Sequence, residues 1–90
     1  MVYYYWMIEI VESAVFSRWL LRLKDRQAKA RILARLRIMA QGSLGDIKPI
    51  GGGLSEALIH YGPGYRLYFL RRGSAMIVLL AGGDKSTQEK

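Results

Sequence analysis

Ninety residues, 51% of them hydrophobic, are enough for one domain with one core and too few for two. Fourteen basic residues, nine of them Arg, oppose seven acidic ones and give a net charge of +7. This excess favours an anionic ligand (nucleic acid, an anionic membrane or an acidic protein), and the alternative is a merely solubilising surface. The absence of Cys excludes disulfides and thiolate metal sites, and a single His excludes most histidine-based zinc sites.

Neither apolar run of the chain resembles a targeting or membrane segment. Residues 1–11 lack a basic start and are interrupted by Glu9, which is unlike a signal peptide. Residues 75–81 are too few to span a bilayer. We therefore expect a cytoplasmic protein with no membrane partner, no metal and no other cofactor.

The first half of the chain predicts a strand and two helices. Residues 2–11 are aromatic and β-branched, which is typical of a strand. Ser13 is a suitable N-cap for an amphipathic helix with a stripe of Phe16, Trp19, Leu20 and Leu23. Asp25 can cap a second helix, whose stripe of Ala28, Ile32, Leu36, Met39 and Ala40 ends before Gly42. Because the link at residues 24–26 is short, we expect an antiparallel helical hairpin.

The second half predicts strands. Residues 44–50 form a weak strand, followed by a flexible connector of three glycines. Further strands are expected at residues 54–61, 65–71 and 75–81, joined by turns at 62–64 and 72–73. The order predicts a single α+β domain over residues 1–90. Its antiparallel or mixed sheet has about four to five strands, with the N-terminal helical hairpin packed on one face.

A tight turn at Gly62-Pro63-Gly64 would place Tyr61 opposite Tyr65 and His60 opposite Arg66. Alternation along the strands then sorts the side chains into two faces. One face is apolar and suited to cover by the helices: Ala57, Ile59, Tyr61, Tyr65, Leu67 and Phe69. The other face is predicted to bring together four chemically active side chains, those of Glu56, His60, Arg66 and Tyr68.

A carboxylate, an imidazole, a guanidinium and a phenol are the groups that an RNA cleavage site uses. One takes the proton of the 2′-hydroxyl, a cation stabilises the phosphorane, and an acid protonates the leaving oxygen. Tyr68 could also stack on a base. Each residue has a simpler alternative: His60 as a solvated side chain, Arg66 as a cross-strand partner of Glu56, Tyr68 as edge packing, and the helical basic residues as a solvated face.

Several runs of the sequence resemble a known family, the RelE/ParE toxin superfamily. The general resemblance lies in Met7-Ile8-Glu9-Ile10, in residues 16–20 with residues 23–25, and in residues 28–32. Residues 45–56, Gly64-Tyr65-Arg66-Leu67-Tyr68-Phe69 and residues 80–88 are similar to one branch of it, the HigB-like addiction module killer proteins. The resemblance implies a RelE-like toxin fold, in which residues 1–6 are an N-terminal extension and a usual C-terminal helix is missing.

The resemblance also implies a function. The protein would be the toxin of a type II toxin–antitoxin pair, a ribosome-dependent mRNA endonuclease that uses metal-free attack of the 2′-hydroxyl on the phosphodiester. Its partners would be the ribosome, mRNA and a cognate antitoxin with a helix-turn-helix, encoded in the adjacent gene. Arg66 matches a phosphate-contacting catalytic Arg, and Lys85 matches a second phosphate contact. Lys48 and Glu56 match positions that this branch usually fills in the same way.

The expected site therefore has two groups of residues. The catalytic group is Arg66, Lys85, His60 and Glu56, and the group that binds RNA or the ribosome is Lys48, Tyr68, Arg31, Arg35 and Arg37. The chain departs from the branch at Leu58, where Arg is common, which removes one cation. Two alternatives remain open: a ParE-like, non-enzymatic inhibitor of DNA gyrase, and an inactive toxin relic that only binds its antitoxin.

Overall fold

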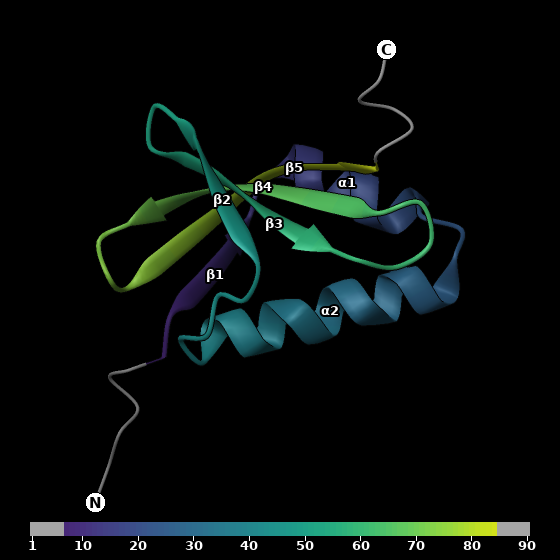
Figure 1. The fold of residues 1–90 in the computed structure, drawn as a ribbon, viewed down its shortest axis with the longest axis horizontal. Helices are drawn as coiled ribbons and strands as arrows, with labels where there is room; N and C mark the ends of the chain where they lie inside the picture. Colours follow the sequence, from purple (N-terminus) through teal and green to yellow (C-terminus); the bar gives the residue numbers. More distant parts are fainter. Residues whose placement is uncertain (1–6, 85–90) are drawn as a thin grey trace, which may run out of the picture.

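A computed structural model describes residues 7–84 of the chain and shows a five-stranded sheet with two helices (Figure 1). Strand residues outnumber helical ones. Neither helix in this range is both long and apolar enough to cross a membrane. In chain order the elements are β1 (Glu9–Glu12), α1 (Ala14–Arg22), α2 (Arg26–Ala40), β2 (Ile47–Gly51), β3 (Leu54–Ile59), β4 (Tyr65–Arg72) and β5 (Met76–Asp84).

The sheet is mixed, with the strand order β1-β5-β4-β3-β2. Strands β2 to β5 form an antiparallel meander, and β1 pairs in parallel with β5 at the far edge. Gly51 at the end of β2 and the two glycines that follow it form a hairpin turn, and not the flexible connector expected from the sequence. All three have positive φ values of 98°, 62° and 80°, which L side chains rarely adopt.

Both predicted N-caps are confirmed. The Ser13 hydroxyl accepts from the Phe16 amide at 3.1 Å and donates to the Leu80 carbonyl at 2.9 Å, so it also fastens the start of α1 to β5. The Asp25 carboxylate accepts from the amides of Gln27 and Ala28 at the start of α2. These bonds satisfy amides that have no partner inside a helix.

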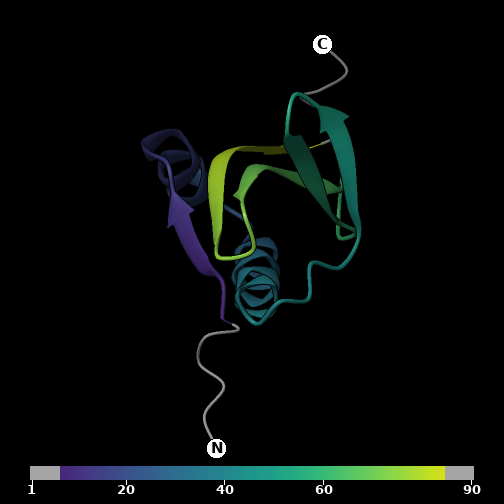
Figure 2. The same cartoon turned by 90° about the vertical axis from the view of Figure 1, so that its left-hand side faces the viewer.

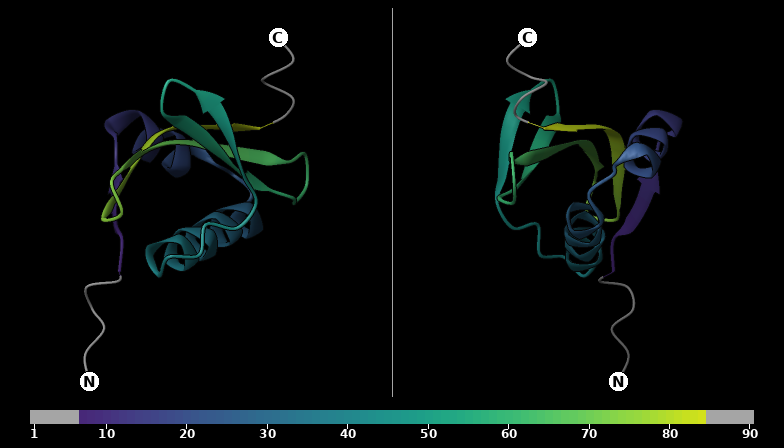
Figure 3. Two further views of the ribbon diagram at one scale, coloured as in Figure 1. Left: turned by 60° about the vertical axis from the view of Figure 1, so that its left-hand side comes forward. Right: turned by 90° about the vertical axis from the view of Figure 1, so that its right-hand side faces the viewer.

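The expected helical hairpin packed on the sheet is wrong, and with it the RelE-like arrangement. α1 packs against β5 and β1, whereas α2 runs beneath the sheet, and the two helices do not lie side by side (Figures 2 and 3). The link between them gives the physical reason, because Leu23 and Asp25 both have extended backbones. In addition, the Tyr61 hydroxyl donates to Gln27 at 3.2 Å, which ties the start of α2 to the β3–β4 loop.

The core forms between one face of the sheet and the apolar stripes of both helices. Its largest fully buried side chains are Phe16, Ile32, Met39, Leu67, Phe69, Ile77 and Leu79. Trp19 lies over β5 so closely that a Cβ on Gly82 would lie 2.3 Å from the indole ring. Gly82 therefore permits α1 to pack directly on the strand. Both helices pack on this face of the sheet. Because successive side chains of a strand point to opposite faces, the polar side chains between the core residues lie on the other face.

The register of β3 on β4 differs from the prediction by two residues. Ile59, and not Tyr61, is the partner of Tyr65, so Leu58 pairs with Arg66 and Glu56 with Tyr68. The turn is a five-residue loop, because His60 bonds Asp46 and Tyr61 bonds the start of α2. A shift of two residues preserves the alternation, so the predicted division of both strands into two faces is correct.

Candidate functional site

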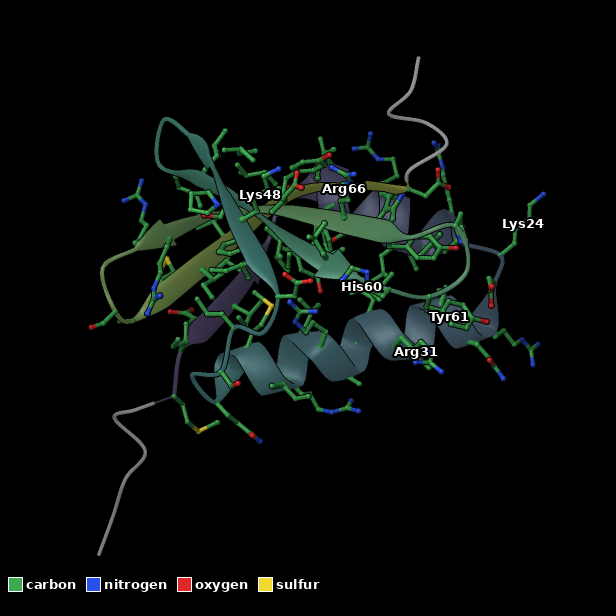
Figure 4. All side chains as sticks on the ribbon, viewed as in Figure 1. Lys24, Arg31, Lys48, His60, Tyr61 and Arg66 are labelled. Atoms are coloured by element: carbon green, nitrogen blue, oxygen red, sulfur yellow. The ribbon has the colours of Figure 1, made fainter. Side chains whose placement is uncertain are left out.

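The candidate site lies on the face of the sheet opposite the core. Glu56 of β3 pairs with Lys48 of β2 on one side and with Tyr68 of β4 on the other, which places the three in one row across the sheet. Arg66 is two residues before Tyr68 and shares its face. Figure 4 shows Lys48 and Arg66 near one another, on the side of the sheet away from α2. We call Lys48, Glu56, Arg66 and Tyr68 the open-face cluster.

An ion pair joins the two charged residues at the centre of the open-face cluster. Arg66 Nη1 donates to Glu56 Oε1 at 3.1 Å. The Glu56 side chain is only 7% exposed, whereas that of Arg66 is 29% exposed. A buried carboxylate requires a partner of opposite charge. The Glu56 carboxylate finds it in Arg66 and thereby holds the Arg66 guanidinium in place. One of the five N–H donors of Arg66 is committed to Glu56, and the exposed part of the guanidinium can meet an anion.

Tyr68 is electrostatically coupled to this pair. Burial raises the pKa of the Tyr68 phenol, the negative charge of Glu56 raises it further, and the positive charge of Arg66 opposes both. The phenol is therefore a neutral hydrogen-bond donor at physiological pH. A neutral aromatic ring beside a cation suits a nucleotide, because the base can stack on the ring and the phosphate can contact the cation.

Small residues flank the cluster on β5. Gly83 is the partner of Arg66 and Ala81 is the partner of Tyr68. Neither side chain is large enough to cover its neighbour across the strands. Within residues 7–84, β5 therefore places no large side chain beside Arg66 and Tyr68.

His60 does not belong to the open-face cluster. Its side chain is 76% exposed, and its Nε2 lies 2.6 Å from Asp46 Oδ2 at the entry to β2. Of the four side chains expected to meet, the structure brings Glu56, Arg66 and Tyr68 together and places His60 in the β3–β4 loop. Lys85 lies outside the described residues.

The three arginines expected to bind RNA have different environments. Arg31 is exposed and lies over the Tyr61 ring, 4.7 Å from its centroid, in a cation–π contact. Arg37 is exposed near the end of α2. Arg35 is half-buried, and its guanidinium donates to the backbone carbonyls of Leu44, Asp46 and Leu58.

Arg35 is consequently a clamp between α2 and the β2–β3 hairpin. Burial lowers its pKa, and the nearby Asp46 charge opposes that effect. Four donated hydrogen bonds leave the guanidinium little capacity for a phosphate. Spacing alone could not distinguish Arg35 from Arg31, because both lie off the apolar stripe of the helix.

A hollow of about 390 Å³ adjoins Arg66 where β3 and β4 separate. Its walls are the last residues of β3, the loop that follows, and the first residues of β4, from Leu58 to Arg66. Sequence reasoning missed Tyr61 and Asp46 as residues of this region. Tyr61 was assigned to the apolar face, and the link from Asp46 to His60 spans fourteen positions with no local signal.

Within residues 7–84 no group of three or more His, Asp or Glu side chains is arranged to hold a metal ion. No family model matches the chain. An uncharacterized protein of Haemophilus influenzae is 43% identical to it over 83 residues, which cover 92% of this chain and 84% of that protein. The chain belongs to the family of this protein. The relative adds no function, because it is described only as uncharacterized.

A solved structure resembles the fold. It is the solution structure of a conserved hypothetical protein, HP0894, from Helicobacter pylori, with a TM-score of 0.60. The match covers 89% of this chain and 97% of that one, at 20% sequence identity. At this identity the likeness shows a shared fold, and the function must be argued from the site.

Proposed function

We propose that this protein is an endonuclease that cleaves mRNA on the ribosome, as the toxin of a type II toxin–antitoxin pair. The observation that carries the proposal is the Arg66–Glu56 ion pair, with Tyr68 and Lys48 beside it on the uncovered face of a basic domain. These groups support the reaction class. The toxin role and the dependence on ribosomes rest on the sequence resemblance.

In the proposed reaction the ribose 2′-oxygen attacks the adjacent phosphorus, and the bond from phosphorus to the 5′-oxygen of the next nucleotide breaks. The products are a 2′,3′-cyclic phosphate and a 5′-hydroxyl. Arg66 donates to the non-bridging oxygens and stabilises the charge that develops on the phosphorane. Glu56 orients Arg66 and accepts the 2′-hydroxyl proton, and the Tyr68 phenol donates a proton to the leaving oxygen.

Other parts of the proposal concern binding. Lys48, directly across from Glu56, adds a second cation for the flanking phosphate, and Lys85 would add a third. The substrate places the protein in the cytoplasm, and a cognate antitoxin with a helix-turn-helix, encoded in the adjacent gene, would hold it inactive.

Primer extension on a reporter mRNA in a purified translation system tests the proposal. We expect cuts only when ribosomes are present, with 5′-hydroxyl ends downstream. Arg66→Ala should lower the cleavage rate by at least about a hundredfold, the cost of losing one charge-stabilising donor. Arg18→Ala removes an exposed Arg of α1 outside the cluster and serves as the matched control.

Intact mRNA and undisturbed translation at saturating protein would refute the endonuclease. DNA breaks and a repair response on induction, with mRNA intact, would replace it with a gyrase poison. Cleavage that is equal in the wild type and Arg66→Ala would refute the assigned site but not the activity.

A further inference from the structure

A chain of adjoining hollows leads away from Arg66 and around the β3–β4 loop to the outer side of α2. The hollow beside Arg66 shares Leu58, Ile59 and His60 with a second one of about 310 Å³, which Arg31 and Ala34 also line. A third hollow shares Arg31 and Ala34 with the second and continues along α2 to Gln27. In Figure 4, Arg66, His60, Tyr61 and Arg31 follow one another along this path.

The chemistry along the path suits a polyanion with flat apolar groups. Arg66 lines the first hollow and Arg31 lines the other two, and the carboxylate of Asp46, which lines the second, is engaged by His60. Leu58, Ile59 and Ala34 give the path an apolar floor. Each hollow has a volume at the lower end of the range found for small-ligand sites, which is enough for one nucleotide.

Tyr61, which lines the hollow beside Arg66, and Arg31, which lines the other two, meet in a cation–π contact. The guanidinium lies over the ring at 4.7 Å, and the Tyr61 hydroxyl is held by Gln27 of α2. The contact with the Tyr61 ring restrains the exposed guanidinium before any ligand arrives, so less entropy is lost when a base stacks on it. Arginine planes and aromatic rings are the usual stacking partners of unpaired bases.

We infer that the groove from Arg66 past His60 to Arg31 binds the nucleotides flanking the scissile bond of a single-stranded RNA. This subsite rests on the proposed function, since it extends the same active site. Arg31 contacts a phosphate or base at least one nucleotide away from the bond that Arg66 contacts. Arg31 is a binding residue and has no part in the chemical step.

Fluorescence anisotropy with 2′-O-methyl oligonucleotides tests the inference without any cleavage, so its result is independent of the proposed activity. A dinucleotide should bind through Arg66 alone, and a hexanucleotide should bind more tightly. Arg31→Ala should lower the affinity for the hexanucleotide by about tenfold, which is the effect of losing one stacked base. Its affinity for the dinucleotide should be unchanged. Arg66→Ala should lower the affinity for both ligands, and Arg18→Ala should change the affinity for neither.

Arg31→Lys keeps the charge and loses the plane, so a hexanucleotide affinity between those of wild type and Arg31→Ala supports stacking. Thermal unfolding of each variant establishes that it is folded. Equal losses of hexanucleotide affinity in Arg31→Ala and Arg18→Ala would overturn the inference, because they would indicate a general effect of positive charge. A glutamate-rich peptide that binds as tightly as the hexanucleotide, with the same dependence on Arg31, would also overturn it in favour of a protein partner.

Discussion

At the scale of single residues, the ion pair of Glu56 and Arg66 both stabilises and prepares the site. A carboxylate that is 7% exposed would be costly without its guanidinium, so the pair must form whenever the strands form. The same bond holds Arg66 in one position on a strand, and strands position side chains more firmly than loops. The site therefore needs little rearrangement on meeting a phosphate.

Tyr68 gives a prediction about alkaline pH. Its pKa is raised, first by burial and then by Glu56, so the folded protein binds the phenolic proton more tightly than the unfolded chain. The stability that this provides is fully present below about pH 10 and is lost as the pH rises through the higher folded-state pKa. We expect the free energy of unfolding, measured in urea between pH 9 and 12, to fall less steeply in Tyr68→Phe than in the wild type.

The absorbance of tyrosinate gives an independent readout. In the folded protein, part of the tyrosine signal should appear above the pH at which the urea-unfolded chain titrates, and Tyr68→Phe should reduce that part. Burial also raises the pKa of Tyr65, so a late-titrating component remains in the variant. Identical titration curves for the folded wild type and Tyr68→Phe would show that Tyr68 ionises normally.

At the scale of helices and strands, the sequence predicted the order of elements and the two faces of β3 and β4. Helix caps and strand alternation are local signals, and both operated as expected at Ser13, Asp25 and the strands from Leu54 to Arg72. The position of each helix depended on long-range contacts instead. The bond from Tyr61 to Gln27 and the contact of Trp19 with Gly82 join residues more than thirty positions apart, and no local pattern indicates them.

The same limit explains the candidate site. Glu56, Arg66 and Tyr68 were grouped correctly because the pleat alone sorts them. His60 was misplaced because the end of the strand depends on its bond to Asp46. The role of Arg35 was equally hidden, since a clamp on three carbonyls is a property of the assembled fold.

Gly82 supports a prediction about how α1 is attached. Gly82→Ala places a methyl group 2.3 Å from the Trp19 indole, so the helix or the ring must move. We expect a loss of about 1–3 kcal/mol in the free energy of unfolding, the usual cost of overpacking a core. Urea denaturation measures it. Trp19→Leu removes the ring, so adding Gly82→Ala to that variant should cost much less, and additive losses would show that the contact is not the cause.

At the scale of the whole molecule, the fold separates stability from recognition. Within residues 7–84, both helices bury their stripes against one face of the sheet, and the open-face cluster lies on the other face. The two edge strands, β1 and β2, carry residues that disfavour pairing with a strand of another molecule. Pro49 removes one amide from the β2 edge, and Glu9 and Glu12 place charges along β1. The uncovered face is therefore the surface on which a polyanion can bind.

This separation predicts how binding responds to salt. Binding of single-stranded RNA releases counterions, and each phosphate contact contributes about 0.7 to the slope of the logarithm of affinity against the logarithm of salt concentration. If Lys48 and Arg66 each contact one phosphate, the double variant Lys48→Ala/Arg66→Ala should have a slope shallower by about 1.4. The variant Arg18→Ala/Arg22→Ala removes the same charge from α1, and its slope should stay near that of the wild type.

Titrations at four or more salt concentrations, with one oligonucleotide of fixed length, measure these slopes. The net charge of +7 falls to +5 in both double variants, so a general effect of charge would flatten both slopes equally. Only contacts localised on the open face make the two variants differ. Equal flattening would therefore mean that the arginines of α1 and the open-face cluster bind RNA indiscriminately, and that the sheet holds no defined phosphate path.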